Sequence, residues 1–370
     1  MPLLNSKSER QRPSRVQVAG LSCAFLLGLL SSGRAQGGDE SPSSSAGSPQ
    51  TAPASALSIP ALELAPRSQD HTIVQLRRFF DDRGGVVTVR EELRVDADGS
   101  NSPPHTLTFL RVEGELPGSP LSQRWAQTYN RYGNLFYRHG CFRIRDLAKA
   151  QQNYALYDFG VVVRAGRTAH RVVIFPNQVF PNGLDKAIWL LDVDTATFLP
   201  LYTAEYDARF RLLSEIEAVS FSTTVQLGTP SPSMMVVSSQ QSVAAAKAFM
   251  GNPAGVIEPS SLLGGEYGLK SVEVAVNPLN NRQSLTLGYT DGIDQFFVVQ
   301  SPGTSDYFAS LPTQKSAAGN SNTIARYRDA SMTVLLFWDD GVGFQVTGRG
   351  SLGRLDGIAK SIYTQALLSR

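Results

Sequence analysis

Two acidic residues in the middle of the sequence, Asp192 and Asp194, have types and a spacing that could do chemistry. They stand in the segment "IWLLDVDTATFLPLYTAEYD", between an apolar run and an alternating one. Neighbouring carboxylates can bind a cation or act as general acid and base. A calcium loop that begins at Asp192 fails at three defining positions, which hold Ala196, Thr197 and Thr203. The pattern favours a turn between two strands, where aspartate accepts backbone hydrogen bonds, over a catalytic pair.

The glycine-rich segment "GRGSLG", residues 348–353, matches the dinucleotide-binding pattern G-x-G-x-x-G between a predicted strand and a predicted helix. Such a site also needs a further strand with an acidic residue about 20 positions later. The sequence given runs to Arg370. We therefore expect a glycine-rich bend before a last helix, and no nucleotide cofactor.

The best local candidate for metal ligands is "HGC", which contains His139 and Cys141. Two ligands without a partner cluster fall short of a zinc site, so the sequence predicts no metal. We expect a surface histidine and a buried thiol, because free cysteine packs as a small apolar residue. No G-x-S-x-G, Walker or H-E-x-x-H motif occurs, and we expect neither a cofactor nor an enzyme. The four histidines are scattered singly, at His71, His105, His139 and His170.

The N-terminal residues have the pattern of an export signal. Basic residues within 7–15 precede an apolar run at 16–30, and residues 33–35 offer small side chains where a signal peptidase reads. We predict that residues 1–35 are a signal peptide, cleaved after Ala35. A retained membrane anchor is the alternative, and the length of the run disfavours it because a spanning helix needs roughly 18 or more apolar residues.

Removal of the signal segment changes two further expectations. It takes away five basic residues and one acidic residue, which lowers the formal net charge from +2 to −2. A nucleic-acid partner then has no electrostatic support. Of the two cysteines, Cys23 leaves with the signal, so Cys141 is alone and the mature chain can form no intramolecular disulfide.

Composition divides the rest of the chain. Residues 36–70 are rich in Ser, Pro, Ala and Gly, a mix that buries little apolar surface, and they predict a disordered tether. Order is expected to begin at residue 71 with a helix, because apolar residues of "HTIVQLRRFF" fall at helical spacing. These apolar residues are Ile73, Leu76, Phe79 and Phe80.

Seven short β-rich runs follow, and the gaps between them carry Gly, Pro, Asn or Asp. This pattern predicts an antiparallel sheet in a domain of residues 71–227. Proline and glycine mark residues 228–262 as an interdomain connection, with a short helix in "SVAAAKAFM". Residues 263–370 hold further strand-like runs and end in a helix with one apolar stripe, so we predict an α+β fold with two domains. The stripe consists of Leu355, Ile358, Ala359, Ile362 and Ala366.

A basic cluster in "YRHGCFRIRDLAK" includes Arg138, Arg143 and Arg145. Its functional interpretation is a contact with an anion or an acidic partner. The structural interpretation is a solvated strand face or helix edge, on which arginine stems cover apolar surface. The alternation of nearby residues favours a surface strand, and these three arginines are the candidate partner contacts.

The stretch from "VVVRAGRTAHRVVIFP" to "RLLSEIEAVSF" resembles the later half of the N-terminal domain in the periplasmic sigma-E regulators of the RseB/MucB family. In that family a strand ending in a proline loop precedes a tryptophan-bearing strand, an acidic turn and two more strands. "DVDT" then corresponds to the turn between two strands of a curved sheet. The matching positions are Gly166, Arg167, Pro176, Trp189, Leu190, Asp192, Thr195, Leu201 and Glu205.

The C-terminal part resembles the same family. "EYGLKSVEVAVNPLNNRQSLTLGYTDGIDQFFVV" is similar to its entry segment, strand pair and "SDGL" segment, which here is "TDGI". "FQVTGRGSLGRLDGIAKSI" is similar to its terminal strand, glycine bend and helix, with Ile358, Ala359 and Ser361 on an "IA-x-S" pattern. Residues 71–160 match poorly, and the tether has no counterpart in the family.

The resemblance implies a LolA-like N-terminal domain, which is a curved antiparallel half-barrel with helices, and a smaller C-terminal α+β domain that ends in a helix. It also implies a periplasmic regulator that binds the periplasmic part of a membrane anti-sigma factor, shields it from a protease, and senses envelope lipid or lipoprotein. A lipid or lipoprotein carrier without a regulatory partner is the alternative. Self-association of the chain stays open.

An apolar cavity within such a bent sheet could take an acyl chain. Alternation puts Val172 and Ile174 on one face of their strand, and Trp189 and Leu191 on one face of the next. These four residues are the candidates for the lining of a lipid cavity. The sequence leaves open which face lines it, because a sheet buried on both sides shows the same pattern.

Overall fold

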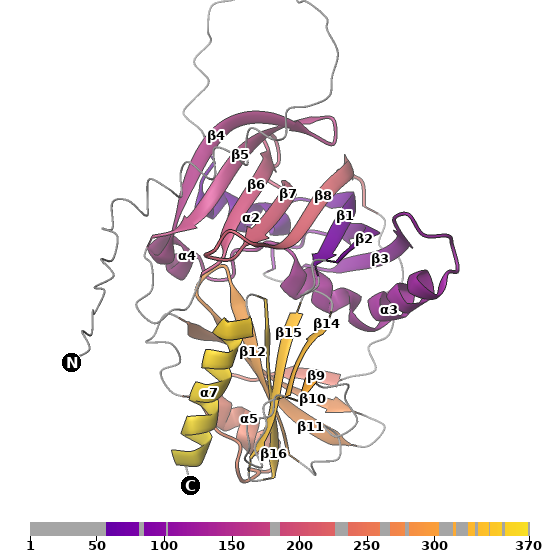
Figure 1. Ribbon diagram of the computed structural model, residues 1–370. Coiled ribbons are helices and arrows are strands. Elements are labelled where there is room, and N and C mark those ends of the chain that lie inside the picture. Colours follow the sequence, from indigo (N-terminus) through magenta and orange to yellow (C-terminus); the bar gives the residue numbers. More distant parts are fainter. Residues whose placement is uncertain are drawn as a thin grey trace, which may run out of the picture. The chain divides into compact units, whose positions relative to one another are not determined.

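The computed structural model describes most of the chain from residue 57 onward. Residues 55–370 form one compact unit that contains two antiparallel sheets (Figure 1). The predicted signal segment, its cleavage site and the first part of the predicted tether lie outside the described residues. The described residues are 57–80, 85–100, 103–177, 186–225, 236–259, 267–277, 281–302, 314–315, 325–329, 332–339, 341–349 and 352–368.

The first sheet has eight strands in the order β3-β2-β1-β8-β7-β6-β5-β4, and every pairing is antiparallel. It does not close into a barrel, because β3 and β4 stand at its two edges. The strands are β1 (His71–Phe80), β2 (Val86–Val95), β3 (His105–Val112), β4 (Tyr154–Arg164), β5 (Arg167–Pro176), β6 (Ile188–Asp194), β7 (Pro200–Tyr206) and β8 (Leu212–Ser222).

Three of the described helices cover one face of this sheet, which we call the helix-covered face (Figure 1). α2 (Ile59–Ser68) and α4 (Leu147–Asn153) share an apolar cluster with β5 and β6. α3 (Pro120–Gly140) packs through a second cluster on β1 and β2. The N-cap residues Ser58 and Ser119 accept a backbone N–H from the first turns of α2 and α3, which fixes where these helices begin.

Residues 71–80 form strand β1, so the helix predicted there is wrong. Every second side chain of the strand is buried, and three of these five are polar. The apolar residues alone therefore do not alternate, and their spacing imitates a helix. The chain tolerates the polar ones because Gln75 and Arg77 donate hydrogen bonds to Glu91 of β2. The five side chains are His71, Ile73, Gln75, Arg77 and Phe79.

The predicted tether is also wrong for residues 59–68, which form α2. Ile59, Leu62 and Ala65 are buried at helical spacing, on the side that meets the first sheet. Proline in the first turn is compatible with a helix, although it made the segment look unstructured by composition.

The second sheet also has eight strands among the described residues, in the order β13-β14-β15-β16-β12-β11-β10-β9, so it is larger than expected. All of its pairings are antiparallel. The strands are β9 (Val236–Ser239), β10 (Gly268–Asn277), β11 (Arg282–Thr290), β12 (Gln295–Pro302), β13 (Gln314–Lys315), β14 (Ala325–Asp329), β15 (Met332–Asp339) and β16 (Val342–Gly348).

Two of the described helices pack on the second sheet. α7 (Leu352–Leu368) buries all five residues of its predicted apolar stripe in the second core. The short helix predicted in "SVAAAKAFM" is present as α5 (Val243–Phe249). Val243 and Ala246 of α5 are buried in the same core, and β9 pairs with β10. These parts of residues 228–262 therefore pack with the second sheet.

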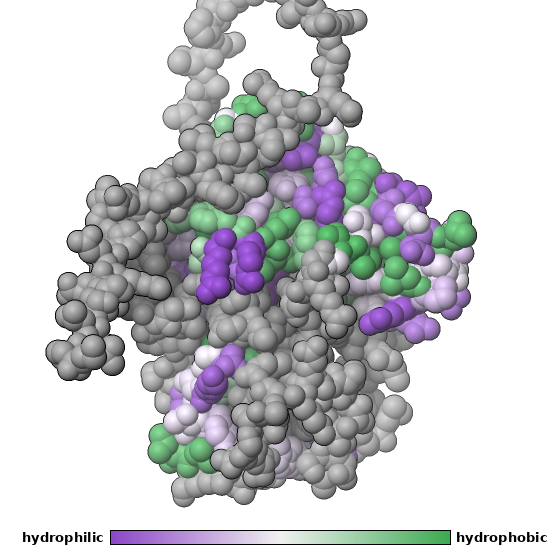
Figure 2. Space-filling model, viewed as in Figure 1, coloured by the Kyte–Doolittle hydropathy of each residue, from purple (hydrophilic) through white to green (hydrophobic). Residues whose placement is uncertain are grey.

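The surface of the described residues is mixed in hydropathy. Figure 2 shows hydrophilic and hydrophobic residues side by side over the first sheet and α3. Edge strand β4 exposes large apolar side chains, with Val161 63% and Val163 72% exposed. None of the described helices combines the length and the apolarity that crossing a membrane requires.

Candidate functional site

The two aspartates singled out by the sequence are both buried, and they have different roles. Asp194 begins the β6–β7 turn, where it accepts hydrogen bonds from the backbone N–H and the hydroxyl of Thr197 at 2.9 and 2.7 Å. This is the predicted turn. Asp192 lies within β6, and Arg164 and Arg171 pair with its carboxylate at 2.5 and 2.7 Å. Two guanidinium groups on one carboxylate fit structural ion pairing better than general base catalysis.

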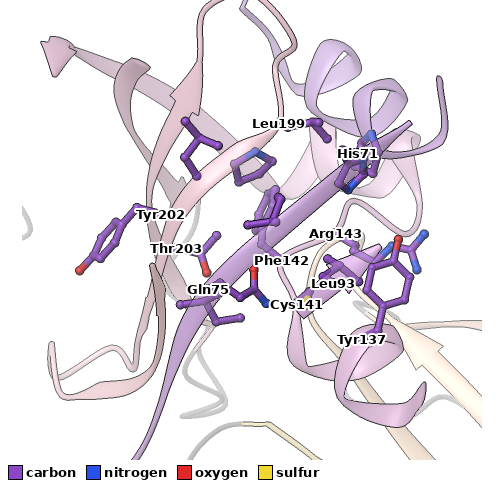
Figure 3. Close-up of a pocket in the computed structure, with 15 residues that line it drawn as sticks. His71, Gln75, Leu93, Tyr137, Cys141, Phe142, Arg143, Leu199, Tyr202 and Thr203 are labelled. Carbon is purple, nitrogen blue, oxygen red and sulfur yellow. The ribbon is translucent and has the colours of Figure 1, made fainter. Parts of the chain in front are cut away.

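A cavity of about 60 Å³ lies on the helix-covered face of the first sheet (Figure 3). Its walls come from α2, β1, β2, β7, β8, the end of α3 and the residues after it. Most lining side chains are apolar, and His71, Gln75 and Arg143 are among the polar ones. Small-molecule sites usually enclose roughly 300–1,000 Å³. In the described state the cavity is therefore too small for an acyl chain.

A buried polar network holds the end of α3 beside this cavity. Arg77 of β1 donates from Nε and Nη2 to Glu91 of β2 at 3.0 and 2.7 Å, and from Nη1 to the carbonyl oxygen of Gly140 at 2.9 Å. Tyr129 of α3 also donates to Glu91. Burial opposes the charge on Arg77, but the nearby Glu91 carboxylate raises the pKa of Arg77, so the pair stays ionised.

Part of the "HGC" motif lines the cavity. Cys141 is half-buried, although the sequence predicted a buried thiol, and its Sγ accepts a hydrogen bond from Arg77 at 3.4 Å. The side chain of His139 lies outside the described residues. Within the part of the chain that is described, no three His, Cys, Asp or Glu side chains are placed to hold a metal ion together.

Residues 141–146, which we call the linking segment, connect the cavity to the second sheet. The first three of them line the cavity. The backbone N–H groups of the last two donate to the carbonyl oxygen of Gly292, at 2.7 and 3.1 Å. Gly292 lies in the turn between β11 and β12 of the second sheet. The linking segment therefore contacts the cavity at one end and the second sheet at the other.

The β11–β12 turn enters the core of the first sheet, and we call this contact the joint. Ile293 packs in the same apolar cluster as Ala150 of α4. Tyr154 of β4 donates to the carboxylate of Asp291 at 2.7 Å. Gly292 has a φ of +116°, and a Cβ on it would overlap the backbone of Ala150. The joint therefore requires glycine at this position.

The glycine-rich segment supplies another part of the joint. Its Gly348 ends β16, its Leu352 begins α7, and the side chain of Arg349 is buried, whereas residues 350 and 351 lie outside the described residues. The guanidinium of Arg349 pairs with Glu205 of β7 at 2.7 Å and donates to Ser214 of β8. It also lies 5.0 Å from the ring centre of Trp189, which Phe142 of the linking segment contacts edge-on at 5.2 Å. The segment positions a cation against the first sheet.

Three carboxylates of the joint are buried, those of Glu205, Asp291 and Asp294. Burial raises the pKa of Asp291. Burial, together with the charges of Asp291 and Glu205, raises the pKa of Asp294 well above its usual value. Burial, followed by repulsion from Arg143 and Arg349, lowers the pKa of Arg145 in the linking segment. The joint is thus a dense group of interacting charges, and its three carboxylates and Arg349 are buried.

The four candidates for the lipid-cavity lining lie together on the helix-covered face. β5 and β6 place Val172 opposite Leu191 and Ile174 opposite Trp189. All four are buried in the apolar cluster that contains Leu62 of α2, and none of them lines the cavity. Alternation thus found an apolar face, but it does not distinguish a packed face from a hollow one.

The three arginines predicted as partner contacts lie at different places in the structure. Arg143 lines the cavity, with its guanidinium 4.9 Å from the ring centre of Tyr137, and Arg145 belongs to the linking segment. The side chain of Arg138 lies outside the described residues. The surface strand predicted here is wrong, because the basic cluster runs from the end of α3 through the linking segment into α4.

The sequence interpretation missed α3, which builds one wall of the cavity. Its signals were present. Ser119 and Pro120 form a cap with proline in the first turn, and Leu121, Trp125 and Tyr129 then recur every four residues. These three residues pack with the cluster on β1 and β2. The acidic residues of the β11–β12 turn were also missed, because "DGID" has the composition of an ordinary exposed turn.

Comparison with known proteins gives structural similarity. No protein-family model matches the chain, and no curated protein matches its sequence. The chain is similar to a crystal structure of MucB in complex with MucA(peri), at 18% identity and a TM-score of 0.43, over 81% of this chain and 95% of that chain. It is similar to the Pseudomonas aeruginosa MucA/MucB complex at 17% identity and a TM-score of 0.44, with the same coverage. A structure of MucB gives 16% identity, a TM-score of 0.44 and coverage of 82% and 95%. These structures are of the family that the sequence motifs resemble.

Proposed function

We propose that this chain is an exported regulatory binding protein. It binds the periplasmic part of a membrane anti-sigma factor, and its affinity for this partner changes when an envelope lipid or lipoprotein enters the cavity on the first sheet. One observation carries the proposal, which is the position of the linking segment between the cavity and the joint. A guest that widens the cavity displaces residues 141–143. The nearby residues Arg145 and Asp146 donate hydrogen bonds to the second sheet, so the displacement reaches that contact.

An apolar guest suits the cavity once it widens. Ile73, Leu93, Leu201 and Ile216 contribute apolar walls from four strands. At about 60 Å³ the cavity is closed to an acyl chain, so entry requires movement of the end of α3 and of the linking segment. A guest that binds the widened conformation better shifts the population toward it, and this difference in affinity is what a sensor needs.

The contact between Phe142, Trp189 and Arg349 gives the guest a second route to the joint. Phe142 lines the cavity and packs on Trp189. Arg349, which comes from beyond β16, lies against the same tryptophan and pairs with Glu205. Displacement of Phe142 therefore changes the packing around the cation of the joint. Side chains in close-packed contact transmit such shifts because there is little space to absorb them.

The class of partner and the compartment are proposed from the sequence. The motif resemblance to the RseB/MucB regulators involves both sheets and suggests the anti-sigma factor. The signal-peptide pattern, with cleavage after Ala35, suggests export to the periplasm. We propose a domain that contains residues 71–227 and α2, and another that contains residues 263–370, β9 and α5, as the two bodies that a partner could bridge. The neutralised carboxylate of Asp192 favours binding over hydrolysis.

The alternative function is a lipid or lipoprotein carrier that uses the same cavity without a regulatory partner. The two functions differ in what the protein retains. A carrier is expected to keep bound lipid through purification and to have no affinity for a membrane regulator. A regulator is expected to capture the soluble part of a single-span membrane protein, and to release it when a lipid is supplied.

A pull-down with mature protein, residues 36–370, tests the proposal. Captured proteins and extractable lipids are both identified by mass spectrometry, with and without detergent-solubilised envelope lipid. We expect one membrane protein with an extracytoplasmic segment, and less of it when lipid is present. Lipid alone, without any membrane protein, would support the carrier. Neither lipid nor membrane protein would contradict both functions.

The route through Phe142 is tested with Phe142→Ala, and Tyr157→Ala is the matched control. Phe142 is buried between the cavity and Trp189, whereas Tyr157 is 54% exposed on edge strand β4. We expect the Phe142 variant to keep its partner but to lose the response to lipid. The control should behave as wild type. An unchanged lipid response in a folded Phe142 variant would exclude this route.

A further inference from the structure

Two polar side chains that line the cavity have hydrogen-bonding atoms without a partner in the described part of the chain. Tyr137 and His71 are each 3% exposed. The hydroxyl of Tyr137 is buried and makes no hydrogen bond to any described residue. His71 bonds to the carbonyl oxygen of Gln69 through Nδ1 at 2.8 Å, and its Nε2 has no such bond. Because buried polar groups are nearly always paired, these two atoms are the ones that a polar ligand group in the cavity would meet.

The two side chains lie at the same end of the cavity. His71 of β1 stands opposite Val95 of β2, and such paired residues have Cβ atoms about 4.5–5.5 Å apart. Tyr137, near the end of α3, belongs to one apolar cluster with Val95 and Leu93. Figure 3 shows His71 and Tyr137 on one side of the cavity and Thr203 on the other. One small group can therefore approach both side chains.

The bond at Nδ1 decides which chemical group suits this end of the cavity. Nδ1 donates its hydrogen to a carbonyl oxygen, so Nε2 of the neutral ring is an acceptor, and the hydroxyl of Tyr137 is a donor. A carboxyl group matches both, because its carbonyl oxygen accepts from the phenol and its O–H donates to Nε2. The proton can also move to the ring, which leaves a carboxylate beside an imidazolium. The net charge is zero in both forms, so no uncompensated charge is buried.

The charges nearby favour the pair of a carboxylate and an imidazolium. Burial raises the pKa of Tyr137, and the charges of Arg143 and Arg145 act against this rise, so the potential at the phenol suits an anion. Burial lowers the pKa of His71, and the charge of Asp70 acts against this fall, so it favours a proton on the ring. An alcohol gives up its proton far less readily than a carboxyl group, and an ester has none to give. These neighbours therefore favour a carboxylic acid over both.

We propose that the guest of this cavity is a long-chain carboxylic acid, whose carboxyl group binds between Tyr137 and His71 and whose chain lies along the apolar walls. The proposal rests on the proposed function, because the chain fits only after the cavity widens. A volume of about 60 Å³ already has room for a group of a few atoms. The rest of the lining is mostly apolar, as a single acyl chain requires.

Calorimetric titration of the mature chain, residues 36–370, tests the head group. The probes are palmitoleic acid, its methyl ester and the alcohol of the same chain, each below the concentration at which it forms micelles. We expect the acid to bind at least about tenfold more tightly than the other two, because only the acid satisfies both side chains. Equal affinity for the three probes, or no binding of the acid, would overturn the proposal.

Tyr137→Phe and His71→Asn identify the two groups. The first removes only a hydroxyl, and the second keeps a donor for the carbonyl oxygen of Gln69 but removes Nε2. Each should lower the ratio of acid affinity to ester affinity at least about fivefold. The matched control is Tyr157→Phe, whose ring is 54% exposed on β4 and which should keep the wild-type ratio. Thermal unfolding shows which variants fold, and a wild-type ratio in either folded variant overturns the proposal.

Two further measurements separate the sources of a carboxylate and the two proposals. An excess of acetate of about a hundredfold should not displace the bound acid, because acetate buries no chain. Displacement by acetate would indicate a site for small anions and overturn the lipid assignment. The pull-down with envelope lipid asks only whether lipid releases the membrane partner. Lipid-dependent release, together with equal affinities for acid, ester and alcohol, would therefore overturn the carboxyl site and still support the proposed function.

Discussion

Two buried ionic groups lie near the two ends of the linking segment, and they differ in the number of charged groups that interact. Beneath α3, one carboxylate, Glu91, receives a guanidinium and a phenol, and its arginine also binds a helix carbonyl. In the joint, one arginine faces Glu205 while Asp291 and Asp294 are buried beside it. A matched pair fixes one geometry, whereas three carboxylates that interact with Arg145, Lys186 and Arg349 share their charges, so the strength of that contact depends more on pH. The molecule thus has a rigid end and an adjustable end.

The largest effect is expected at the rigid end, from Arg77→Met. It leaves Glu91 buried without its cation, and removal of one partner of a buried pair costs about 3–5 kcal/mol in the free energy of unfolding. Chemical denaturation at neutral pH measures this loss. The control is Arg111→Met, whose side chain is 54% exposed and which should cost less than about 1 kcal/mol. A cost of under about 1 kcal/mol for Arg77→Met would contradict the assignment of a fixed pair.

Arg349→Gln should have the next largest effect, about 2–3 kcal/mol at pH 8, because Glu205 loses its cation. The cost should be smaller at pH 5, where protonation can neutralise the acids of the joint. Denaturation at the two pH values measures the difference. An equal cost of Arg349→Gln at pH 5 and at pH 8 would contradict the difference between the two ends, since the strength of a fixed pair does not change between these pH values.

Gly292→Ala is expected to destabilise the joint by about 1–3 kcal/mol more than Gly118→Ala. Both glycines have a positive φ, of +116° and +80°, but a Cβ meets the backbone of Ala150 only at position 292 and nothing within 4 Å at position 118. The pair of variants therefore separates overlap from backbone strain. Thermal unfolding gives the stabilities, and hydrogen exchange at residues 289–294 shows whether the loss is local. Equal stabilities would mean that the turn does not enter the first core.

The smallest effect concerns His71, which lines the cavity. Burial lowers its pKa, so the folded state disfavours the charged ring. Stability is then lost as the pH falls below the unfolded value of about 6.5. His71→Asn should remove at most about 1 kcal/mol of this loss between pH 7.5 and 5.5. Unfolding curves of the two proteins at both pH values measure it, and identical pH profiles would show that His71 does not contribute.

The sequence predicted the elements correctly where the buried side chains of a segment are mostly apolar. Strands β5 to β8 and the stripe of α7 were predicted because their segments are rich in apolar, β-branched and aromatic residues, and in α7 the apolar residues recur at helical spacing. The prediction failed at β1, where Gln75 and Arg77 occupy buried positions that apolar residues usually take. Their burial depends on Glu91, a residue of another strand, and a pattern within one segment does not contain that information.

The candidate site was predictable only in part, for a related reason. The apolar face with Val172 and Trp189 was visible in the alternation, but whether it is packed depends on where α2 and α4 lie. The joint brings together residues as distant in sequence as Tyr154 and Asp291. Neither stands in a local motif for ion pairing. Contacts of this kind come from the tertiary arrangement, and the sequence indicates them only as turn residues.

The half-buried thiol of Cys141 gives the molecule a built-in reporter. If export removes Cys23, this sulfur is the one group in the mature chain that maleimide and similar thiol reagents modify fastest, and it lies in the cavity wall beside the guanidinium of Arg77. The rate of labelling would then measure how often the cavity wall opens to solvent. The natural cysteine would in this way report how often the cavity wall opens, without an engineered probe.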